Sequence, residues 1–201
     1  MENNILLHAT GINKQFSGVP VLKDVELSIN KGEVHALMGE NGAGKSTLIK
    51  IITGVYTKDS GQIFIEGKPV EINSRQDARN CGISVIYQEL SLIPALTVVE
   101  NIFLGQEIKR RGFLDKKEMR RRVKELIDKY EFDINPDTVV QSLGMAKRQL
   151  IEILKALSMD AKLIIMDEPT SALSAAESEK LFETIRGLRD KGTSILYISH
   201  R

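Results

Sequence analysis

Cysteine is nearly absent from this sequence of 201 residues, since Cys81 is the only one. A single cysteine cannot form an internal disulfide, so the composition excludes a disulfide-stapled fold and favours a reducing compartment. No histidine or second cysteine flanks Cys81 to suggest a metal site. We therefore expect Cys81 to be a small buried residue.

Long hydrophobic runs and a strong net charge are also missing. No apolar run approaches the ~20 residues of a membrane-spanning helix, and the acidic start, MENNILLHATG, is too poor in apolar residues for a signal peptide. The net charge is only +1, so nothing global indicates a nucleic-acid or membrane-surface binder. The basic runs KRRG and KKEMRRRVKEL are mixed with acids, and the pattern favours a solvated helix face over a patch that binds a phosphate backbone. Any membrane role is expected to come through a partner protein.

The order of predicted elements indicates an α/β fold. Strand-like runs such as VLKDVELSI and SGQIFIEGKPV fill the first third, and the alternation at Ile63 and Ile65 predicts an antiparallel sheet. Helical patterns follow, with Asp115 as the N-cap of one helix. LIIMDEP and TSILYISH, separated by a helical run, are typical of buried parallel strands. We expect a single domain over residues 1–201, in which residues 1–88 and 158–201 form the core with its β layer and residues 89–157 an inserted helical lobe. Because no covering helix follows the last strand, we also expect the sequence to be a piece of a longer chain.

Residues 39–47, GENGAGKST, match the pattern G-x-x-x-x-G-K-[ST] between a predicted strand and a predicted helix. The small residues allow backbone N–H groups to face phosphate oxygens, and the helix adds the positive end of its dipole. Lys45 would reach the β- and γ-phosphates, and Ser46 would ligate Mg²⁺. The candidate nucleotide-binding residues here are Gly39, Glu40, Asn41, Gly42, Ala43, Gly44, Lys45, Ser46 and Thr47. A chance glycine-rich turn is the alternative, and the flanking elements favour nucleoside triphosphate binding.

The run LIIMDEP places Asp167 and Glu168 at the carboxyl end of a buried strand. In an open α/β sheet this end lies beside the phosphate loop. Asp167 would hold Mg²⁺ directly or through water, and Glu168 would act as the general base for the attacking water. A solvated turn is the alternative for an acidic pair after a strand. The accompanying phosphate loop favours the functional interpretation.

With these two motifs, nearly the whole chain resembles the ATP-binding subunit of ATP-binding-cassette (ABC) transporters, a family with a P-loop NTPase (RecA-like) core, an N-terminal antiparallel β subdomain and an inserted helical subdomain. The resemblance implies that Gln88, in VIYQEL, touches Mg²⁺ and the attacking water, and that His200, in YISHR, contacts the γ-phosphate. It also implies that Phe16 stacks on adenine. The segments GISVIYQELSLIPALTVVENIFLGQE and DEPTSALSAAE look closer still to ribose- and galactose-type monosaccharide importers, in which one polypeptide usually carries two cassettes and this chain would be the first.

The family's LSGGQ signature aligns poorly with residues 143–147, LGMAK. In the family this segment holds the γ-phosphate bound to the opposite cassette. Gly144 offers no hydroxyl, and Met145 and Ala146 carry side chains where backbone should approach phosphate closely. Ser174 also stands where the family usually has aspartate. Two interpretations stay open: a degenerate half-site that faces a partner cassette with an impaired phosphate loop, which we prefer, or a chain that no longer hydrolyses ATP well.

The resemblance implies an ATPase subunit that binds ATP and Mg²⁺ and drives uptake of a monosaccharide such as ribose or galactose. Its expected place is the cytoplasmic face of the membrane. The expected partners are permease subunits, a second cassette (in the same chain or in a second copy) and, indirectly, an external sugar-binding protein, with no nucleic acid. The rivals are a soluble ABC ATPase of translation or DNA repair and an ATP-sensing module without turnover. Repair members carry a long coiled coil between the two motifs, and residues 46–166 hold no sustained heptads.

Overall fold

The structure is a computed structural model that describes residues 4–40 and 42–199. The chain divides into two compact units. The first unit comprises residues 1–85, 161–168 and 188–201, and the second comprises residues 86–160 and 169–187. The sequence pattern placed residues 169–187 with the core, whereas the structure groups them with the helical unit. The domain assignment made from the sequence stays a prediction.

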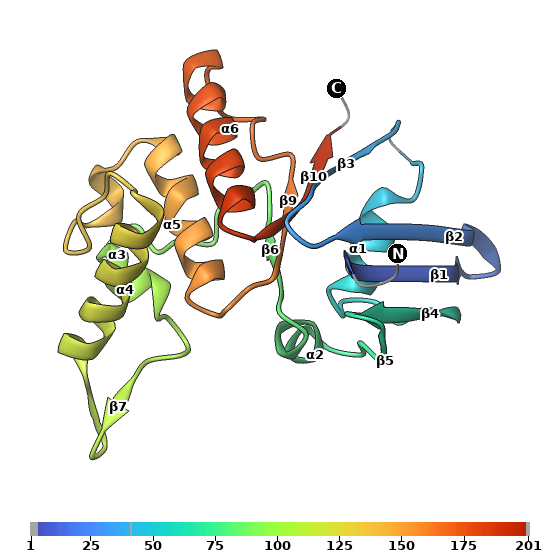
Figure 1. Cartoon of the computed structure of the whole chain (residues 1–201), viewed down its shortest axis with the longest axis horizontal. Helices are drawn as coiled ribbons and strands as arrows, with labels where there is room; N and C mark the ends of the chain where they lie inside the picture. Colours follow the sequence, from blue (N-terminus) through green and yellow to red (C-terminus); the bar gives the residue numbers. More distant parts are fainter. Residues whose placement is uncertain (1–3, 41, 200–201) are drawn as a thin grey trace. The chain divides into compact units, whose positions relative to one another are not determined.

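The first unit contains an antiparallel sheet with the strand order β2-β1-β4-β5 (Figure 1). Its strands are β1 (Ile5–Phe16), β2 (Val19–Asn30), β4 (Ser60–Ile65) and β5 (Lys68–Val70). Strand β1 pairs antiparallel with both β2 and β4. Ile63 and Ile65 are buried and alternate with more exposed residues. The antiparallel sheet with one solvated face, expected from that alternation, is present.

Glycine is required where β4 approaches the backbone of β1 closely, at Gly61 and Gly11. Gly61 has a φ of +100°, and a Cβ at this position would lie 2.4 Å from the carbonyl oxygen of Gly11. Real side chains do not approach a backbone oxygen so closely, and the positive φ disfavours any L-residue. The close approach of these two strands therefore depends on Gly61.

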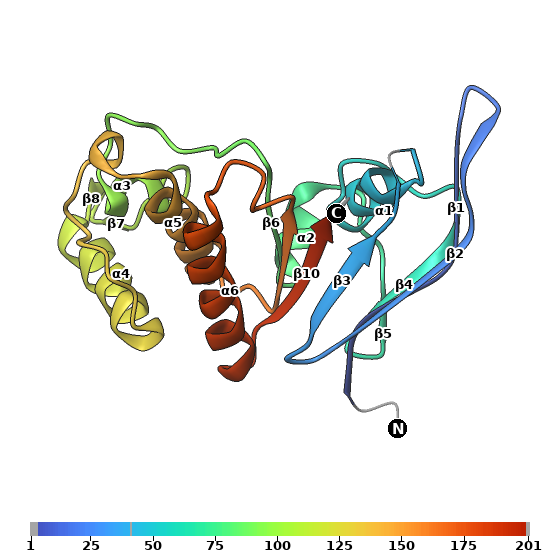
Figure 2. The same cartoon turned by 90° about the horizontal axis from the view of Figure 1, so that it is seen from above.

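A second, parallel sheet of the first unit has the order β3-β10-β9-β6 (Figure 2). Its strands are β3 (Val34–Met38), β10 (Ser194–Ser199), β9 (Leu163–Asp167) and β6 (Ile83–Ile86). Strand β10 pairs parallel with both β3 and β9. The first four residues of β9 are buried, as expected for a strand covered on both faces. The predicted buried parallel strands are thus confirmed.

One hydrophobic core joins the two sheets of the first unit. Helix α1 (Lys45–Ile52) contributes four buried residues to it, and they lie in one cluster with Leu163 of β9 and Leu196 of β10. Helix α2 (Arg75–Asn80) adds Ala78, and Cys81, which follows α2, packs partly buried against the same cluster. Burial raises the pKa of the Cys81 thiol, so this residue is a packing group rather than a reactive thiolate.

A charged cluster ties segments of the first unit that are far apart in sequence. The carboxylate of Glu66 lies 2.9 Å from Lys31 Nζ and 2.6 Å from Lys162 Nζ. The hydrogen bond from Lys162, followed by that from Lys31, lowers the pKa of Glu66 to about 2. Lys31 follows β2, Glu66 follows β4 and Lys162 precedes β9, so the cluster links the turn of one sheet to a strand of the other.

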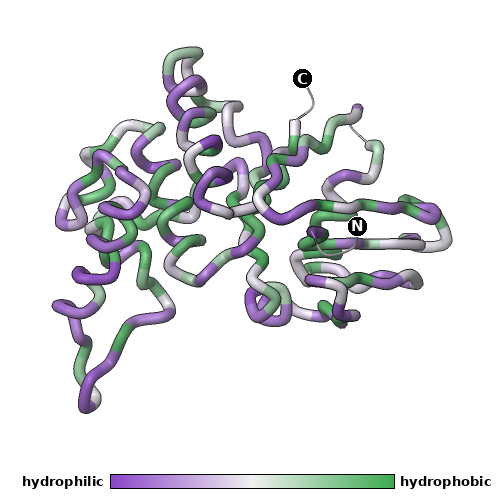
Figure 3. Tube along the Cα trace, viewed as in Figure 1, coloured by the Kyte–Doolittle hydropathy of each residue, from purple (hydrophilic) through white to green (hydrophobic). Residues whose placement is uncertain are grey.

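The second unit is mainly helical (Figure 3). Its elements are α3 (Val98–Ile102), α4 (Lys116–Tyr130), the 3₁₀ turn η2 (Val140–Ser142), α5 (Met145–Leu157) and the hairpin of β7 (Lys109–Arg110) and β8 (Phe113–Leu114). Helix α6 (Ala175–Asp190) begins in this unit. The core of the unit packs α3, α4 and α5 together through residues such as Val98, Val123 and Leu154. Within residues 4–40 and 42–199, the structure contains no helix with the length and hydrophobicity of a membrane span.

The basic runs of the second unit fold in two different ways. Asp115 caps α4 as predicted, because its carboxylate accepts a hydrogen bond of 3.0 Å from the Glu118 N–H. The exposed side of α4 carries ion pairs such as Lys124–Asp128, so the KKEMRRRVKEL run is the expected solvated helix face. For KRRG the helical interpretation is wrong, because residues 109–112 form β7 and the turn of the hairpin.

We expect Gly61→Ala to lower the free energy of unfolding by about 3 kcal/mol, because strain at positive φ adds to a forced contact with the Gly11 carbonyl. Gly67→Ala is the matched control. Gly67 has a similar φ of +76°, but a Cβ there meets nothing within 4 Å, so its cost should be only about 1 kcal/mol. Urea unfolding of the two variants tests this difference, and equal losses would contradict the contact argument.

Candidate functional site

The phosphate loop of the sequence lies between β3 and α1, and its glycines are required by its shape. Gly42 and Gly44 have φ values of +89° and +88°. A Cβ on Gly44 would lie 2.7 Å from Leu22 Cδ2 and 3.2 Å from the Val21 carbonyl oxygen. The loop therefore turns tightly against β2, and a side chain at Gly44 would push it out of place.

The N-terminus of α1 is free to attract an anion. Gly44 is its N-cap, no side chain caps it, and the first turn contains no acidic residue. The first N–H groups of a helix lack intrahelical partners, and they carry the positive end of the helix dipole. Lys45 lies at the same place, and its Nζ donates hydrogen bonds to the carbonyl oxygens of Gly39 and Glu40, the latter at 2.9 Å.

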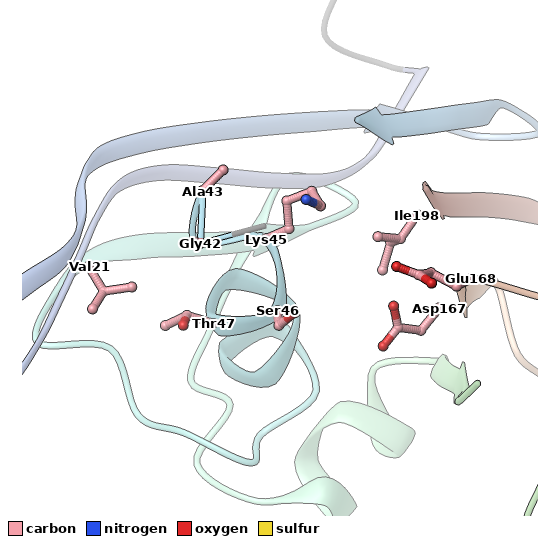
Figure 4. A pocket seen from close by; sticks show the side chains of 10 residues that line it. Val21, Gly42, Ala43, Lys45, Ser46, Thr47, Asp167, Glu168 and Ile198 are labelled. Atoms are coloured by element: carbon pink, nitrogen blue, oxygen red, sulfur yellow. The ribbon is translucent and has the colours of Figure 1, made fainter. Parts of the chain in front are cut away.

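A cavity of about 200 Å³ joins this loop to the end of β9 (Figure 4). Asp167 and Glu168 line it together with Ser46 and Ile198. Its full lining is Val21, Gly42, Ala43, Gly44, Lys45, Ser46, Thr47, Asp167, Glu168 and Ile198. The two motifs that the sequence singled out independently, 122 residues apart in the count from Lys45 to Asp167, thus line one cavity.

The backbone at Glu168 is unusual. Its φ is +47°, a left-handed conformation that non-glycine residues rarely adopt and that costs roughly 1 kcal/mol or more. The Glu168 N–H donates to the Ile198 carbonyl oxygen at 3.2 Å, which fixes the chain as it leaves β9. Strain of this kind is concentrated at functional sites.

The electrostatics of the carboxylate pair favour a bound cation. Burial and the neighbouring Glu168 charge raise the pKa of Asp167, while Lys45 and Lys50 act in the opposite direction. Desolvation and a like charge both disfavour the ionised form, and a divalent cation would relieve both. Within the described ranges, no three His, Cys, Asp or Glu side chains cluster as metal ligands. A cation here would therefore complete its shell with Ser46 and with oxygens of water or phosphate, as Mg²⁺ commonly does.

Phe16 lies at the end of β1, outside the lining of this cavity. Its side chain is 39% exposed, and its ring packs against the Tyr56 ring with centroids 5.2 Å apart. Lys14 Nζ lies 5.5 Å from the same ring. A partly exposed aromatic face beside a cation suits a planar ring, and the adenine contact of Phe16 stays a prediction.

Gln88 belongs to the second unit and is exposed just after β6. The segment that follows it is held by a buried carboxylate, since Glu152 Oε1 accepts hydrogen bonds from Ser91 N at 2.7 Å and Ser91 Oγ at 2.9 Å. Buried Asn101 adds a hydrogen bond from Ile93 N at 2.7 Å. Sequence reasoning missed Glu152, whose signal was an acidic residue among the apolar positions of α5. The predicted residues Asn41 and His200 lie outside the described residues.

The signature-like segment, residues 143–147, forms the start of α5. Gly144 is the N-cap, with a φ of −67° and no side-chain hydrogen bond. Met145 is 39% exposed, and Lys147 is paired with Asp133 at 3.0 Å. Glu177 lines the same cavity of about 580 Å³ as Ala146. Hydrogen bonds from the Ser174 N–H and hydroxyl lower the pKa of Glu177, and the Ala146 N–H adds to this effect. An acidic group therefore lies close to the first turn of α5.

The curated relatives include ATP-binding proteins named for the import of ribose or galactose. A ribose import ATP-binding protein of Rubrobacter xylanophilus is 49% identical over 97% of this chain and 39% of its own length. A putative ribose/galactose/methyl galactoside import ATP-binding protein of Burkholderia cenocepacia is 51% identical over 98% of this chain and 38% of its own length. The chain thus spans about two fifths of the length of these relatives.

Solved structures agree with the fold. The ADP conformation of an ATP-binding cassette of an ABC transporter has a TM-score of 0.86 and 28% identity, and the match covers 98% of this chain and 82% of that one. A nucleotide-free ATP-binding cassette has a TM-score of 0.83 over the same shares. The expected fold class is confirmed. The ABC transporter family model matches residues 22–171, and because this span is well over half of the sequence, the chain belongs to the ABC transporter family.

Proposed function

We propose that this chain binds ATP with Mg²⁺ and hydrolyses it to drive import of a monosaccharide through a membrane permease. The observation that carries the proposal is the shared cavity, in which the phosphate loop and the Asp167–Glu168 pair meet. The relatives supply the transport context, since those named here are called import ATP-binding proteins for ribose or galactose. Those names favour import over the soluble ATPases of translation or repair.

The geometry supports a different role for each residue around the γ-phosphate. The loop N–H groups and the start of α1 hold the phosphates, and Lys45 balances the charge that develops during transfer. Glu168 orients a water and accepts its proton as it attacks in line. Bound Mg²⁺ would neutralise phosphate charge, and Asp167 and Ser46 would hold it. Gln88 and His200 complete the proposed catalytic set.

The partners follow from the same proposal. The chain would lie at the cytoplasmic face of the membrane, bound to permease subunits, and receive sugar indirectly from an external binding protein. A second cassette, in the same polypeptide or in another copy, would close over the ATP. The altered signature supports our preference for a degenerate half-site in residues 143–147. An ATP-sensing module without turnover is the second candidate, and that same segment favours it.

The first prediction concerns Glu168. We expect Glu168→Gln to keep ATP binding and to reduce steady-state hydrolysis by about 10²- to 10³-fold, because a general base contributes this much. Glu26→Gln, an exposed change in β2, is the control and should leave hydrolysis unaltered. Tight binding with negligible turnover in the unmodified chain would instead support a site that waits for a partner's signature.

The second prediction concerns the pKa of Asp167. The pKa of Asp167 is higher in the folded than in the unfolded state. At a pH above both values, ionised Asp167 therefore lowers the free energy of unfolding. At a pH below both values the residue is protonated in both states and has no such effect. Asp167→Asn should therefore raise the free energy of unfolding at neutral pH. This gain should shrink and disappear as the pH falls below the ordinary aspartate pKa. Urea unfolding without Mg²⁺ across this range checks the sign, and a gain that persists in acid would contradict it.

The third prediction concerns the start of α5. A Cβ at Gly144 meets nothing within 4 Å, so Ser fits there and would cap the helix. If copies of the chain pair, Gly144→Ser/Met145→Gly/Ala146→Gly should raise ATP turnover at least about tenfold, since one well-placed phosphate donor is worth more than that. The same triple change in a Glu168→Gln background should stay inactive. Unaltered turnover in the first variant would show that this segment is not limiting.

A further inference from the structure

The hairpin of β7 and β8 pairs basic with apolar side chains. Lys109 lies opposite Leu114, and Arg110 lies opposite Phe113. Directly paired residues of antiparallel strands project to the same face, and successive residues project to opposite faces. Each face of the hairpin therefore carries one basic and one apolar side chain. In Figure 3 one arm of the hairpin has the hydrophilic colour and the other arm the hydrophobic colour.

The turn of the hairpin is tight and places a third basic residue at its tip. Arg111 and Gly112 form the two-residue loop, with φ values of +52° and +87°. Positive φ at both central residues is the type I′ turn, which matches the twist of a hairpin. Arginine is an uncommon residue at the first of these positions, where asparagine or glycine is preferred. The Arg111 side chain itself is exposed.

The hairpin is exposed at every one of its six positions, residues 109–114. Phe113 is 81% exposed, more than any other large hydrophobic residue in the described part of the chain, and Leu114 is 50% exposed. Arg110 and Arg111 form no hydrogen bond or ion pair with any described residue. In Figure 1 the hairpin reaches away from α3 and α4. Two adjacent exposed apolar side chains with arginines next to them are the pattern of an interaction site.

The acidic residues nearby do not neutralise the arginines. Glu107 accepts a hydrogen bond of 3.0 Å from the Gly105 N–H. Asp115 caps α4, and Glu118 pairs with Arg121 and Arg122 of the same helix. These carboxylates are engaged within the helical unit, so the tip presents positive charge.

We propose that this hairpin binds an anionic lipid surface. Lys109, Arg110 and Arg111 would contact lipid phosphates, and Phe113 and Leu114 would enter the interface between headgroups and acyl chains. The exposed basic side chains complement anionic headgroups, and the exposed apolar side chains complement the acyl region beneath them. The hairpin would thus add direct lipid contact to the chain, separate from ATP chemistry and from any permease.

Sedimentation of the full chain with lipid vesicles, without nucleotide, tests the proposal. Vesicles of phosphatidylcholine mixed with phosphatidylglycerol should bind the chain, vesicles of phosphatidylcholine alone should not, and added salt should weaken binding. Arg110→Gln/Arg111→Asn should lower the partition coefficient about 30-fold, or about fivefold for each charge. Asparagine suits the type I′ turn, so this variant keeps the hairpin. Phe113→Ser should lower it about tenfold.

The matched control is Arg75→Gln/Arg79→Gln, which removes the same charge from exposed positions of α2 and should leave binding unchanged. An equal loss in this control would overturn the proposal, because net charge alone would then explain binding. Binding that survives in both hairpin variants, equal binding to neutral vesicles, or no binding to either kind would also overturn it. So would vesicle-free size-exclusion chromatography in which the hairpin variants dissociate a dimer, because the hairpin would then contact a second copy.

Discussion

The candidate site depends on a buried strand that ends in two adjacent carboxylates. Four consecutive buried residues fix β9 in the middle of the parallel sheet, so Asp167 is held where water cannot fully solvate it. Burial and Glu168 together raise its pKa, and Glu168 itself leaves the strand with a left-handed backbone. Both features cost folding free energy, so the packing of the rest of the core must supply more than they cost. The cluster that joins both sheets to α1 provides this support.

The phosphate loop forms the other side of the cavity, opposite Asp167 and Glu168. Its position depends on packing against β2, which is distant in sequence. Gly44 lies so close to Leu22 and to the Val21 carbonyl oxygen that β2 sets the position of the loop. Lys45, at the start of α1, contributes to the field at Asp167 and opposes the effect of burial on its pKa. The positive charge of Lys45 therefore stabilises the ionised form of Asp167 across the cavity that they share. A bound phosphate would add negative charge next to the loop, and its cation would add positive charge next to the carboxylates.

The sequence predicted what depends on local pattern. The loop GENGAGKST, the apolar run before Asp167 and the cap at Asp115 each carry their signal within a few residues, and the fold class followed from them. It could not predict contacts between distant residues, such as Leu22 against Gly44 or Glu152 holding Ser91. Its interpretation of KRRG as helix was wrong because charge composition does not report backbone conformation. The hairpin there is set by positive φ at Arg111 and Gly112, and arginine gives little sign of such a turn.

Helices α1 and α5 both begin at a glycine N-cap, but their first turns differ in how well they suit an anion. Helix α1 has no acid in its first turn, and Lys45 lies at its start. The first turn of α5 carries the exposed Met145 side chain, its Lys147 is paired with Asp133, and Glu177 lies near the Ala146 N–H. The helix dipole has the same sign at both places. A phosphate approaching α5, however, would meet the Met145 side chain and the Glu177 carboxylate, which already accepts hydrogen bonds from Ser174 and interacts with the Ala146 N–H. This difference is the physical basis for proposing one competent phosphate site and one weakened signature surface in the same chain.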